Sequence, residues 1–247
     1  MSALLTMTKV EWKLFRRDGM SLFFGLVFPP VLLLALGAFI PGFREPNDGL
    51  GGQRLIDLYL PIVIGLALAS LSLSAFPTYM ATYREKGVLR RLATTPVGPA
   101  RLLGAQLLVN VGVAVVAVVL TIAVAVIGFD VAATGNPLGL LAAFVLMATA
   151  MFAVGLVIAA VSPRASVATG IGMAAYFPAL FFAGVYFPRD AMPVSLRVVS
   201  DATPVGSGVQ ALQDTLAGSW PHPLNLAVLM IWIAVSGVVA VRLFRWQ

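Results

Sequence analysis

The sequence contains no cysteine, a single histidine and few charged residues. The lack of cysteine excludes disulfide bonds, thiolate metal sites and a cysteine nucleophile. Charged residues make up 11% of the 247 residues and hydrophobic residues 60%. An ordinary soluble domain contains about a quarter charged residues. A soluble domain cannot hide so much apolar surface, and we therefore interpret the chain as an integral membrane protein.

Motifs of the common catalytic sites are missing as well. His222 stands between two prolines without a nucleophile motif beside it, so we expect neither a catalytic residue nor a metal site. Without a glycine-rich phosphate loop, we expect the chain not to hydrolyse ATP and to hold no cofactor by itself. The net charge of +6 fits the loops of a membrane protein, and we expect no nucleic-acid partner.

Six apolar segments are long enough to cross a bilayer, for which a helix needs roughly twenty residues. We place these spans near residues 20–40, 58–80, 102–129, 137–161, 165–187 and 224–243. They hold no clear ionisable residue, which argues against an ion-coupled secondary transporter, although ion sites lined by carbonyl groups leave that alternative open. The sequence therefore predicts an all-α membrane protein with one transmembrane domain over residues 20–247.

The 16 basic residues divide unevenly between the two sides of the membrane. Four of them fall in loops on one side, and the others share the side of both termini. The four are Arg44, Arg54, Arg189 and Arg197. By the positive-inside rule, both termini and the loop at residues 81–101 are cytoplasmic, in a cell (inner or plasma) membrane. The same division of charge indicates an even number of spans.

The outer loop at residues 188–223 is too long to be a simple connector. Thr203 can cap a helix that has Pro204 at its first position and Gly218 just past its end. One apolar stripe would then contain Val205, Val209, Leu212 and Leu216. Since such a helix is too short to span, we predict short extracellular or re-entrant helices before the last span.

Residues 1–19 have the pattern of an amphipathic helix lying in the headgroup layer. On a helical wheel, one face carries the cations Lys9, Lys13, Arg16 and Arg17. The opposite face carries Leu4, Met7, Leu14 and Phe15, interrupted by Glu11. The alternative interpretation is a solvated basic tail.

A second basic segment lies between the second and third spans. From residue 83 it reads Y-R-E-K-G-V-L-R-R-L-A-T-T-P-V-G-P-A-R. We predict a short helix that starts after Tyr83 and is stopped by Pro96. One face would carry Glu85, Val88, Leu89 and Leu92, and the other Lys86 and Arg90. The positive-inside rule explains part of this charge but not the apolar face beside it.

Polar and aromatic residues within the spans suggest a path for a substrate. The candidates are Ser70, Ser74, Phe177, Phe181 and Phe182. Packing against lipid explains the aromatic residues about equally well, and the serines serve equally as hydrogen-bonding groups between helices. The prolines within the spans are kinks or hinges; they are Pro29, Pro30, Pro77 and Pro178.

These features together resemble the ABC-2 type permease family, the membrane subunits of ATP-binding cassette exporters. The matching motifs are R-E-K-G-V-L-R-R-L-A-T-T-P-V at residues 84–97, R-L-L-G-A-Q at 101–106, F-F-A-G-V-Y-F-P at 181–188 and P-V-G-S-G-V-Q-A-L at 204–212. The resemblance covers essentially the whole chain. It is strongest to the drug and natural-product resistance group.

The resemblance implies export of an amphipathic or lipid-like substrate, driven by ATP and magnesium bound to a separate ATPase subunit. The coupling residues would be Glu85, Gly87, Leu89, Arg90, Arg91, Leu92 and Pro96, and the helix over residues 1–19 would be the connecting helix. A second permease subunit, identical or not, would complete the path between spans two and five. Export of polysaccharide or a lipid precursor is the alternative within the same family.

Overall fold

The computed structural model describes residues 3–47, 52–95, 98–132, 135–187, 189 and 192–243. Within these ranges the long elements are helices, and the extended backbone is limited to one isolated bridge between Pro46 and Arg54. The predicted all-α class is confirmed.

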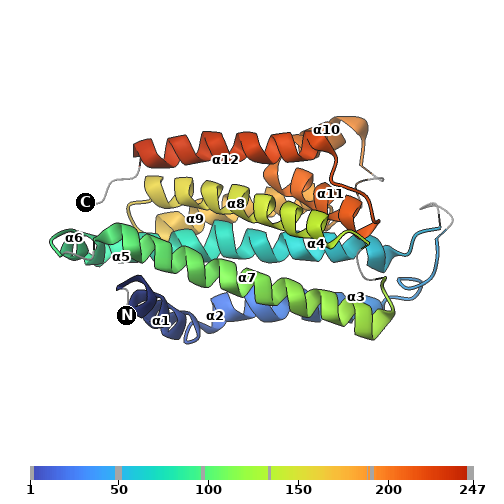
Figure 1. The fold of residues 1–247 in the computed structure, drawn as a ribbon, viewed down its shortest axis with the longest axis horizontal. Coiled ribbons are helices and arrows are strands. Elements are labelled where there is room, and N and C mark those ends of the chain that lie inside the picture. The colour runs from blue at the N-terminus through green and yellow to red at the C-terminus, as the bar shows by residue number, and fades with distance from the viewer. Residues whose placement is uncertain are drawn as a thin grey trace.

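Among the described residues, six helices are long and apolar enough to span a membrane: Gly19–Phe39, Leu55–Glu85, Pro99–Phe129, Pro137–Val161, Ala165–Ala183 and Pro223–Leu243. The first comprises α2 (Gly19–Leu22), η1 (Phe23–Val27) and α3 (Phe28–Phe39), and the second α4 (Leu55–Ala69), η3 (Ser70–Ala75) and α5 (Phe76–Glu85). The other four are α7, α8, α9 and α12. Helices α1 (Ala3–Phe15) and α6 (Val88–Ala93) lie at one end of the bundle, and α10 (Val194–Ala202) and α11 (Pro204–Leu216) at the other (Figure 1).

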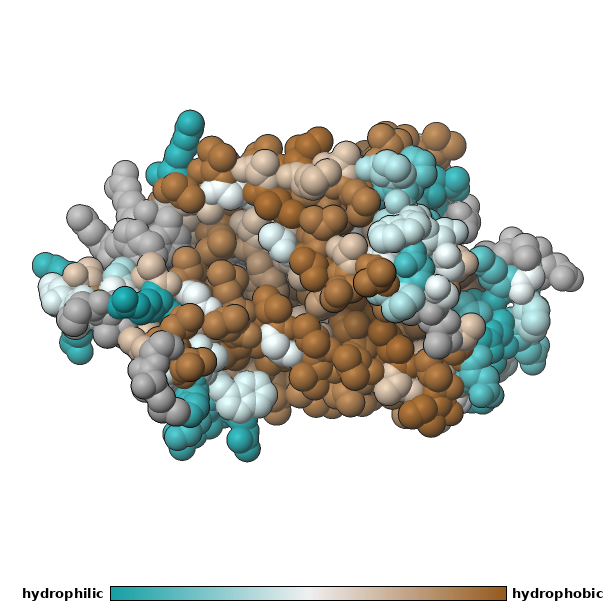
Figure 2. Space-filling model, in the orientation of Figure 1, coloured by the Kyte–Doolittle hydropathy of each residue, from teal (hydrophilic) through white to brown (hydrophobic). Residues whose placement is uncertain are grey.

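The surface polarity follows the same long axis. Figure 2 shows a broad apolar band across the middle of the visible face, with hydrophilic residues gathered at the two ends. An apolar belt of this kind suits a bundle whose middle lies in hydrocarbon and whose ends lie in water. The end of α12 near Leu243 lies at the same end of the bundle as α1 (Figure 1), as expected for an even number of spans.

The second span forms the centre of the bundle. In its most apolar window 83% of the residues are buried, against 17% in the fifth and sixth spans. It contacts the first, third, fourth and fifth spans as well as α11. The core is therefore built around Leu55–Glu85, while α9 and α12 leave most of their surface for lipid or another subunit.

Prolines of the first two spans follow wider turns of the helix. The N–H of Phe28 bonds to Phe23 O, five residues back, and the N–H of Phe76 bonds to Leu71 O in the same way. Pro29 and Pro77 come directly after these π-helical turns. Proline has no N–H to donate, and its ring clashes with the preceding turn of an α-helix. The π-helical turn and the proline therefore occur together where the regular hydrogen-bond pattern of the span is interrupted. The sequence predicted a kink or a hinge but not the π-helical form.

Glycines let two spans approach the irregular part of the second span closely. A Cβ at Gly155 of α8 would collide with Ser72 O, and one at Gly172 of α9 with Leu73 O. Both carbonyls belong to η3. Helices α8 and α9 therefore pack directly against the backbone of the π-helical turn, which any larger residue would prevent.

The predicted helix in the outer loop is present with the predicted signals at its ends. In α11 the hydroxyl of Thr203 accepts a hydrogen bond from Gly206 N at 3.0 Å, and Gly218 has φ of 86° just after the helix end. The apolar stripe is largely buried, and α11 packs against α4, α8 and α12. The bounds of α10, the helix that precedes α11, were not predicted.

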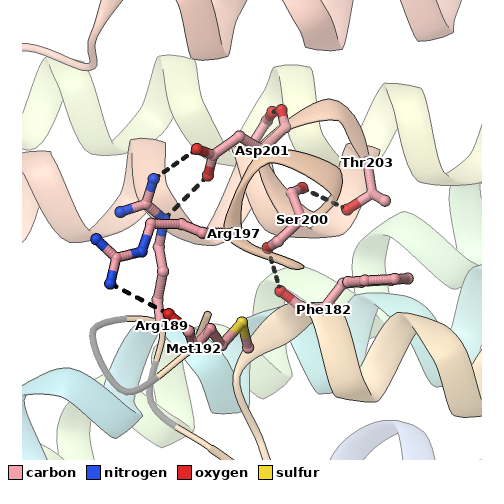
Figure 3. Close-up of polar contacts among 8 residues, drawn as sticks. Phe182, Arg189, Met192, Arg197, Ser200, Asp201 and Thr203 are labelled. Atoms are coloured by element: carbon pink, nitrogen blue, oxygen red, sulfur yellow. Dashed lines mark hydrogen bonds and ion pairs between the residues drawn. The ribbon is translucent and has the colours of Figure 1, made fainter. Parts of the chain in front are cut away.

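A set of polar contacts fixes α10 against the end of α9 (Figure 3). Arg189 donates to Asp201 through Nε at 2.9 Å and forms an ion pair with it. The hydroxyl of Ser200 donates to Phe182 O at 2.7 Å. The fifth span was predicted to reach residue 187, but it ends at Ala183 because Gly184 takes φ of 90°, a left-handed conformation that stops the helix.

Candidate functional site

The helix predicted to start after Tyr83 begins later than expected. The second span continues without interruption to Glu85, and Gly87 then takes φ of 68°, a conformation that glycine adopts at little cost. Helix α6 starts only at Val88 and ends at Ala93. The prediction placed the break too early because it did not use the left-handed turn at the glycine. Pro96 lies outside the described residues.

The apolar side of α6 faces its own chain. Leu89 is 2% exposed, and α6 contacts α5 and α7. Arg90 and Arg91 are exposed, while Val88 and Leu92 are partly buried. In this conformation Leu89 anchors α6 to the bundle and cannot touch a partner directly, so the surface that α6 offers is basic rather than mixed.

The end of the second span is tied to the hairpin between α8 and α9. Arg84 donates through Nη1 to Ala159 O at 2.7 Å and to Ser162 O at 2.6 Å. The carboxylate of Glu85 accepts a hydrogen bond from Ala165 N at 3.0 Å, at the first residue of α9. These contacts join the end of the second span to the fourth and fifth spans.

Helix α1 packs along α7 with a face that differs from the predicted one. Phe15 is buried as expected, but Leu14 is 42% exposed, and Glu11, interpreted as an interruption, is 4% exposed. The hydroxyl of Tyr83 donates to Glu11 Oε2 at 2.6 Å, and Gln106 Nε2 donates to the same oxygen. The inner face of α1 is built around a hydrogen-bonded carboxylate, which the helical wheel alone did not show.

Two carboxyl groups at this end of the bundle are held by neutral donors. Burial raises the pKa of the Glu11 carboxyl above its ordinary value, and the hydrogen bonds from Tyr83 and Gln106 offset part of that effect. Asp18 caps the first span by accepting from Ser21 N at 3.4 Å, and its Oδ2 accepts from the hydroxyl of Tyr79 at 2.6 Å. Both carboxylates connect the N-terminal segment to the second span.

The predicted cations of the N-terminal segment lie on the surface. Lys9 and Lys13 on α1, and Arg16 and Arg17 just after its end at Phe15, are all exposed. Lys86, Arg90 and Arg91 near α6 are exposed as well, and α1 and α6 lie at the same end of the bundle (Figure 1). This end therefore carries exposed positive charge from two separate segments of the chain.

A cavity of about 620 Å³ opens between the first, second and fifth spans. Its walls are mostly apolar and aromatic, with hydroxyl groups and one carboxylate. The residues that line it are Asp18, Met20, Ser21, Phe24, Gly25, Ser70, Leu71, Ser74, Ala75, Thr78, Tyr79, Thr82, Thr169, Met173, Tyr176 and Phe177. A pocket of this size and lining can hold a drug-sized amphipathic molecule.

The five residues predicted to line a substrate path do not all line the same cavity. Ser70, Ser74 and Phe177 line this first cavity, whereas Phe181 lines neither cavity described here. Phe182 lines a second cavity of about 290 Å³ beside α11. Asp18 and Tyr79 also line the first cavity but were not predicted as path residues. The available signal for Asp18 was its position three residues before Ser21 at the start of a span, which is the spacing of a helix cap.

His222 has a local structural role. Its backbone N donates to Asp214 Oδ2 at 2.9 Å, and its ring Nδ1 accepts from Leu224 N at 3.4 Å. These contacts fix the start of α12.

Comparison with known proteins decides the family. Residues 2–217 match the family described as ABC-2 type transporter. The chain belongs to the ABC-2 type transporter family. It is also similar to the daunorubicin resistance ABC transporter permease protein DrrB1 of Streptomyces coeruleorubidus, with 27% identity over 227 residues, 89% of this chain and 78% of that protein. The resemblance to ABC-2 permeases and to the drug-resistance group is thus confirmed, and the six apolar spans are those of a multi-pass membrane permease.

Proposed function

We propose that this permease moves amphipathic, drug-like molecules out of the cell and that a separate ATPase subunit supplies the energy. The observation that carries the proposal is the cavity of about 620 Å³ between the first, second and fifth spans, which reaches Asp18 at the end of the bundle that carries α1 and α6. Its mostly apolar lining favours an amphipathic molecule over a polysaccharide, whose hydroxyl groups need many polar partners.

The basic end of the bundle supports docking of the ATPase. Exposed cations on α1 and α6 suit an acidic surface on a cytoplasmic partner, in agreement with the orientation that the positive-inside rule predicts. Arg84 and Glu85 join the end of the second span to the hairpin of α8 and α9. A displacement of α6 by the ATPase would reach the cavity walls through these contacts.

A second permease subunit would complete the path. Within the described residues the cavity lies between three spans of one chain, and its fifth-span wall belongs to a helix with only 17% of its window buried. A second copy or a related permease would close the open side of the cavity, while lipid would cover the remaining apolar surface.

Reconstitution tests the proposal. The chain is co-purified with its ATPase subunit and placed in proteoliposomes, where ATP-dependent uptake of a fluorescent amphipathic dye into inside-out vesicles is measured. We expect uptake to require both subunits and ATP, and Glu85→Ala to reduce it while leaving the complex intact. Uptake that persists without ATP and follows an ion gradient would instead indicate a secondary transporter. ATP hydrolysis by the purified chain alone would contradict the proposal that a separate subunit supplies the energy.

A further inference from the structure

The first cavity contains one side chain that is charged at neutral pH. Asp18 lines it, and no lysine or arginine appears among its described lining residues. The donors to the Asp18 carboxylate, the hydroxyls of Ser21 and Tyr79 at 2.6 Å each, are neutral. No described cation pairs with Asp18. The negative charge beside this largely apolar cavity therefore has no ion-pair partner among the described residues, and its exposed neighbours in the chain, Arg16 and Arg17, do not line the cavity.

Helix capping does not explain that charge. Asp18 accepts from Ser21 N and so caps the first span. Asparagine and serine cap helices about as well as aspartate, so capping requires an acceptor at this position but not an anion. Burial by itself raises the pKa of the Asp18 carboxyl, but the hydrogen bonds from Ser21 and Tyr79 outweigh it and leave the pKa lower than usual. The group is thus ionised at neutral pH, although neutral residues would fill its structural role.

The charge lies at the end of the cavity that is nearest to the predicted membrane surface. Asp18 directly precedes the first span, while Phe24, Tyr176 and Phe177 line the cavity further along the spans. An amphipathic cation within a bilayer has a matching arrangement, with its charged nitrogen at the interface and its apolar body among the acyl chains. Aromatic rings near the charge also attract cations.

We propose that the cavity selects amphipathic cations, whose basic nitrogen pairs with the Asp18 carboxylate while the apolar body lies among the aromatic side chains of the spans. This inference rests on the proposed function, because it treats the cavity as the substrate site. A phosphate group beside Asp18 would be repelled, which excludes anionic lipids and phospholipids whose amine is joined to a phosphate. The substrate class is therefore a basic amphiphile without a phosphate.

Binding of two matched probes tests the proposal. The purified chain in phosphatidylcholine nanodiscs is titrated with N-dansyl-1,8-octanediamine, which carries a free amine, and with its N-acetyl derivative, which is neutral. We expect the wild-type chain to bind the amine roughly fivefold more tightly than the neutral probe, the upper scale of a partly exposed charge pair. Nanodiscs without protein correct for partition into lipid.

Asp18→Asn is the decisive variant because asparagine removes the charge and keeps an acceptor for Ser21 N, although its NH2 group replaces the oxygen that accepts from the hydroxyls of Ser21 and Tyr79. It should weaken binding of the amine by roughly fivefold and change binding of the neutral probe by less than about twofold. Asp18→Glu should keep the preference for the amine. Glu45→Gln, which removes an exposed carboxylate beyond the far end of the first span, should leave both affinities unchanged.

Equal binding of the two probes by the wild-type chain would overturn the inference, even if Asp18→Asn did not fold. A parallel loss of both probes in Asp18→Asn would also overturn it, since it would show a structural role alone. Neither result bears on ATP coupling, because the nanodiscs contain no ATPase. If coupled export failed in the reconstitution above while these probes still separated, the proposed function would fall and the cation site would stand.

Discussion

The two ends of the bundle treat their charges in opposite ways. At the end that carries α10 and α11, arginines are paired with aspartates: Arg54 with Asp57 at 2.8 Å and Arg189 with Asp201 at 2.5 Å. At the end that carries α1 and α6, the carboxylates of Glu11 and Asp18 are held by neutral donors, and the cations of α1 and α6 are exposed. The ion pairs of the described residues therefore lie at one end, while the other end keeps exposed positive charge on its surface.

This difference separates a fixed end from an end that is suited to a partner. Arg54 also donates to Phe129 O at 3.2 Å, so this arginine, which pairs with Asp57 at the start of the second span, also joins that span to the end of the third. Ion pairs of this kind hold loops in one arrangement. Unpaired surface cations contribute little to stability but speed the encounter with an acidic partner and select it. The positive-inside rule would produce the same excess of cations without a partner, and reversal of the charge on α6 separates the two explanations.

The largest expected effect is on coupling, from reversal of charge on α6. Arg90→Glu combined with Arg91→Glu should lower ATP-driven uptake roughly tenfold or more, because like charges facing each other at an interface cost several kcal/mol. The measurement is uptake by the reconstituted complex together with co-purification of the ATPase. The matched control, Arg90→Lys combined with Arg91→Lys, should retain most of the activity. Full activity of the charge-reversed variant would contradict docking through these cations and would indicate that they serve only to orient the chain in the membrane.

A smaller effect is expected from the carboxylate beneath α1. Glu11→Ala leaves the hydroxyl of Tyr83 and the amide of Gln106 without their acceptor in a buried site, which costs about 1–3 kcal/mol. The thermal unfolding midpoint of the purified chain should fall accordingly. Glu11→Gln keeps an acceptor and should lose less. If both variants unfold with the wild-type midpoint, the contact between α1 and the second span is not needed for stability.

At the opposite end the ion pair should contribute less. Asp201→Asn breaks the ion pair with Arg189. The side chains of Arg189 and Asp201 are 29% and 37% exposed, so solvent screening limits the loss of unfolding free energy to about 1 kcal/mol. Unfolding midpoints measured at low and at high salt should converge for wild type and variant, because salt screens the pair. A difference that persists in high salt would show that packing around Asp201, rather than charge, holds α10.

The smallest expected effect is a dependence of stability on pH. Because burial raises the pKa of Glu11 in the folded chain, the folded state holds this proton more tightly than the unfolded state. Its contribution to stability is present below the ordinary glutamate pKa and is lost as pH rises through the raised value. Across this window the unfolding midpoint of the wild type should therefore fall relative to that of Glu11→Gln as pH rises, so that the advantage of the wild type over this variant shrinks. Parallel curves would contradict this.

Local signals were sufficient to predict several elements from the sequence. Uninterrupted apolar length predicted the six spans, and the fourth span was predicted at residues 137–161, where α8 lies. Thr203, Pro204 and Gly218 predicted α11, because a cap, a first-turn proline and a left-handed glycine act within a few residues of the helix that they bound. Where a signal was available but not used, as at Gly87, the predicted boundary was wrong.

Other features depend on residues that are distant in the sequence. Glu11 interrupts an apolar face when α1 is considered alone, and its partners Tyr83 and Gln106 stand on two other helices. Gly155 and Gly172 lie on helices α8 and α9, yet they border the same π-helical turn of the second span. The hydrophobic periodicity of a single segment cannot predict such contacts between residues of different helices.

The sequence by itself determined that this is a membrane permease of six spans whose basic residues gather on one side, because hydrophobic length, charge distribution and family motifs are properties of the chain. Only the tertiary structure decided that Asp18, Ser70 and Phe177 line one cavity and that Leu89 faces inward. The physical reason is that burial and proximity arise from the packing of helices against one another. A residue's position along one helix does not fix which neighbour it meets.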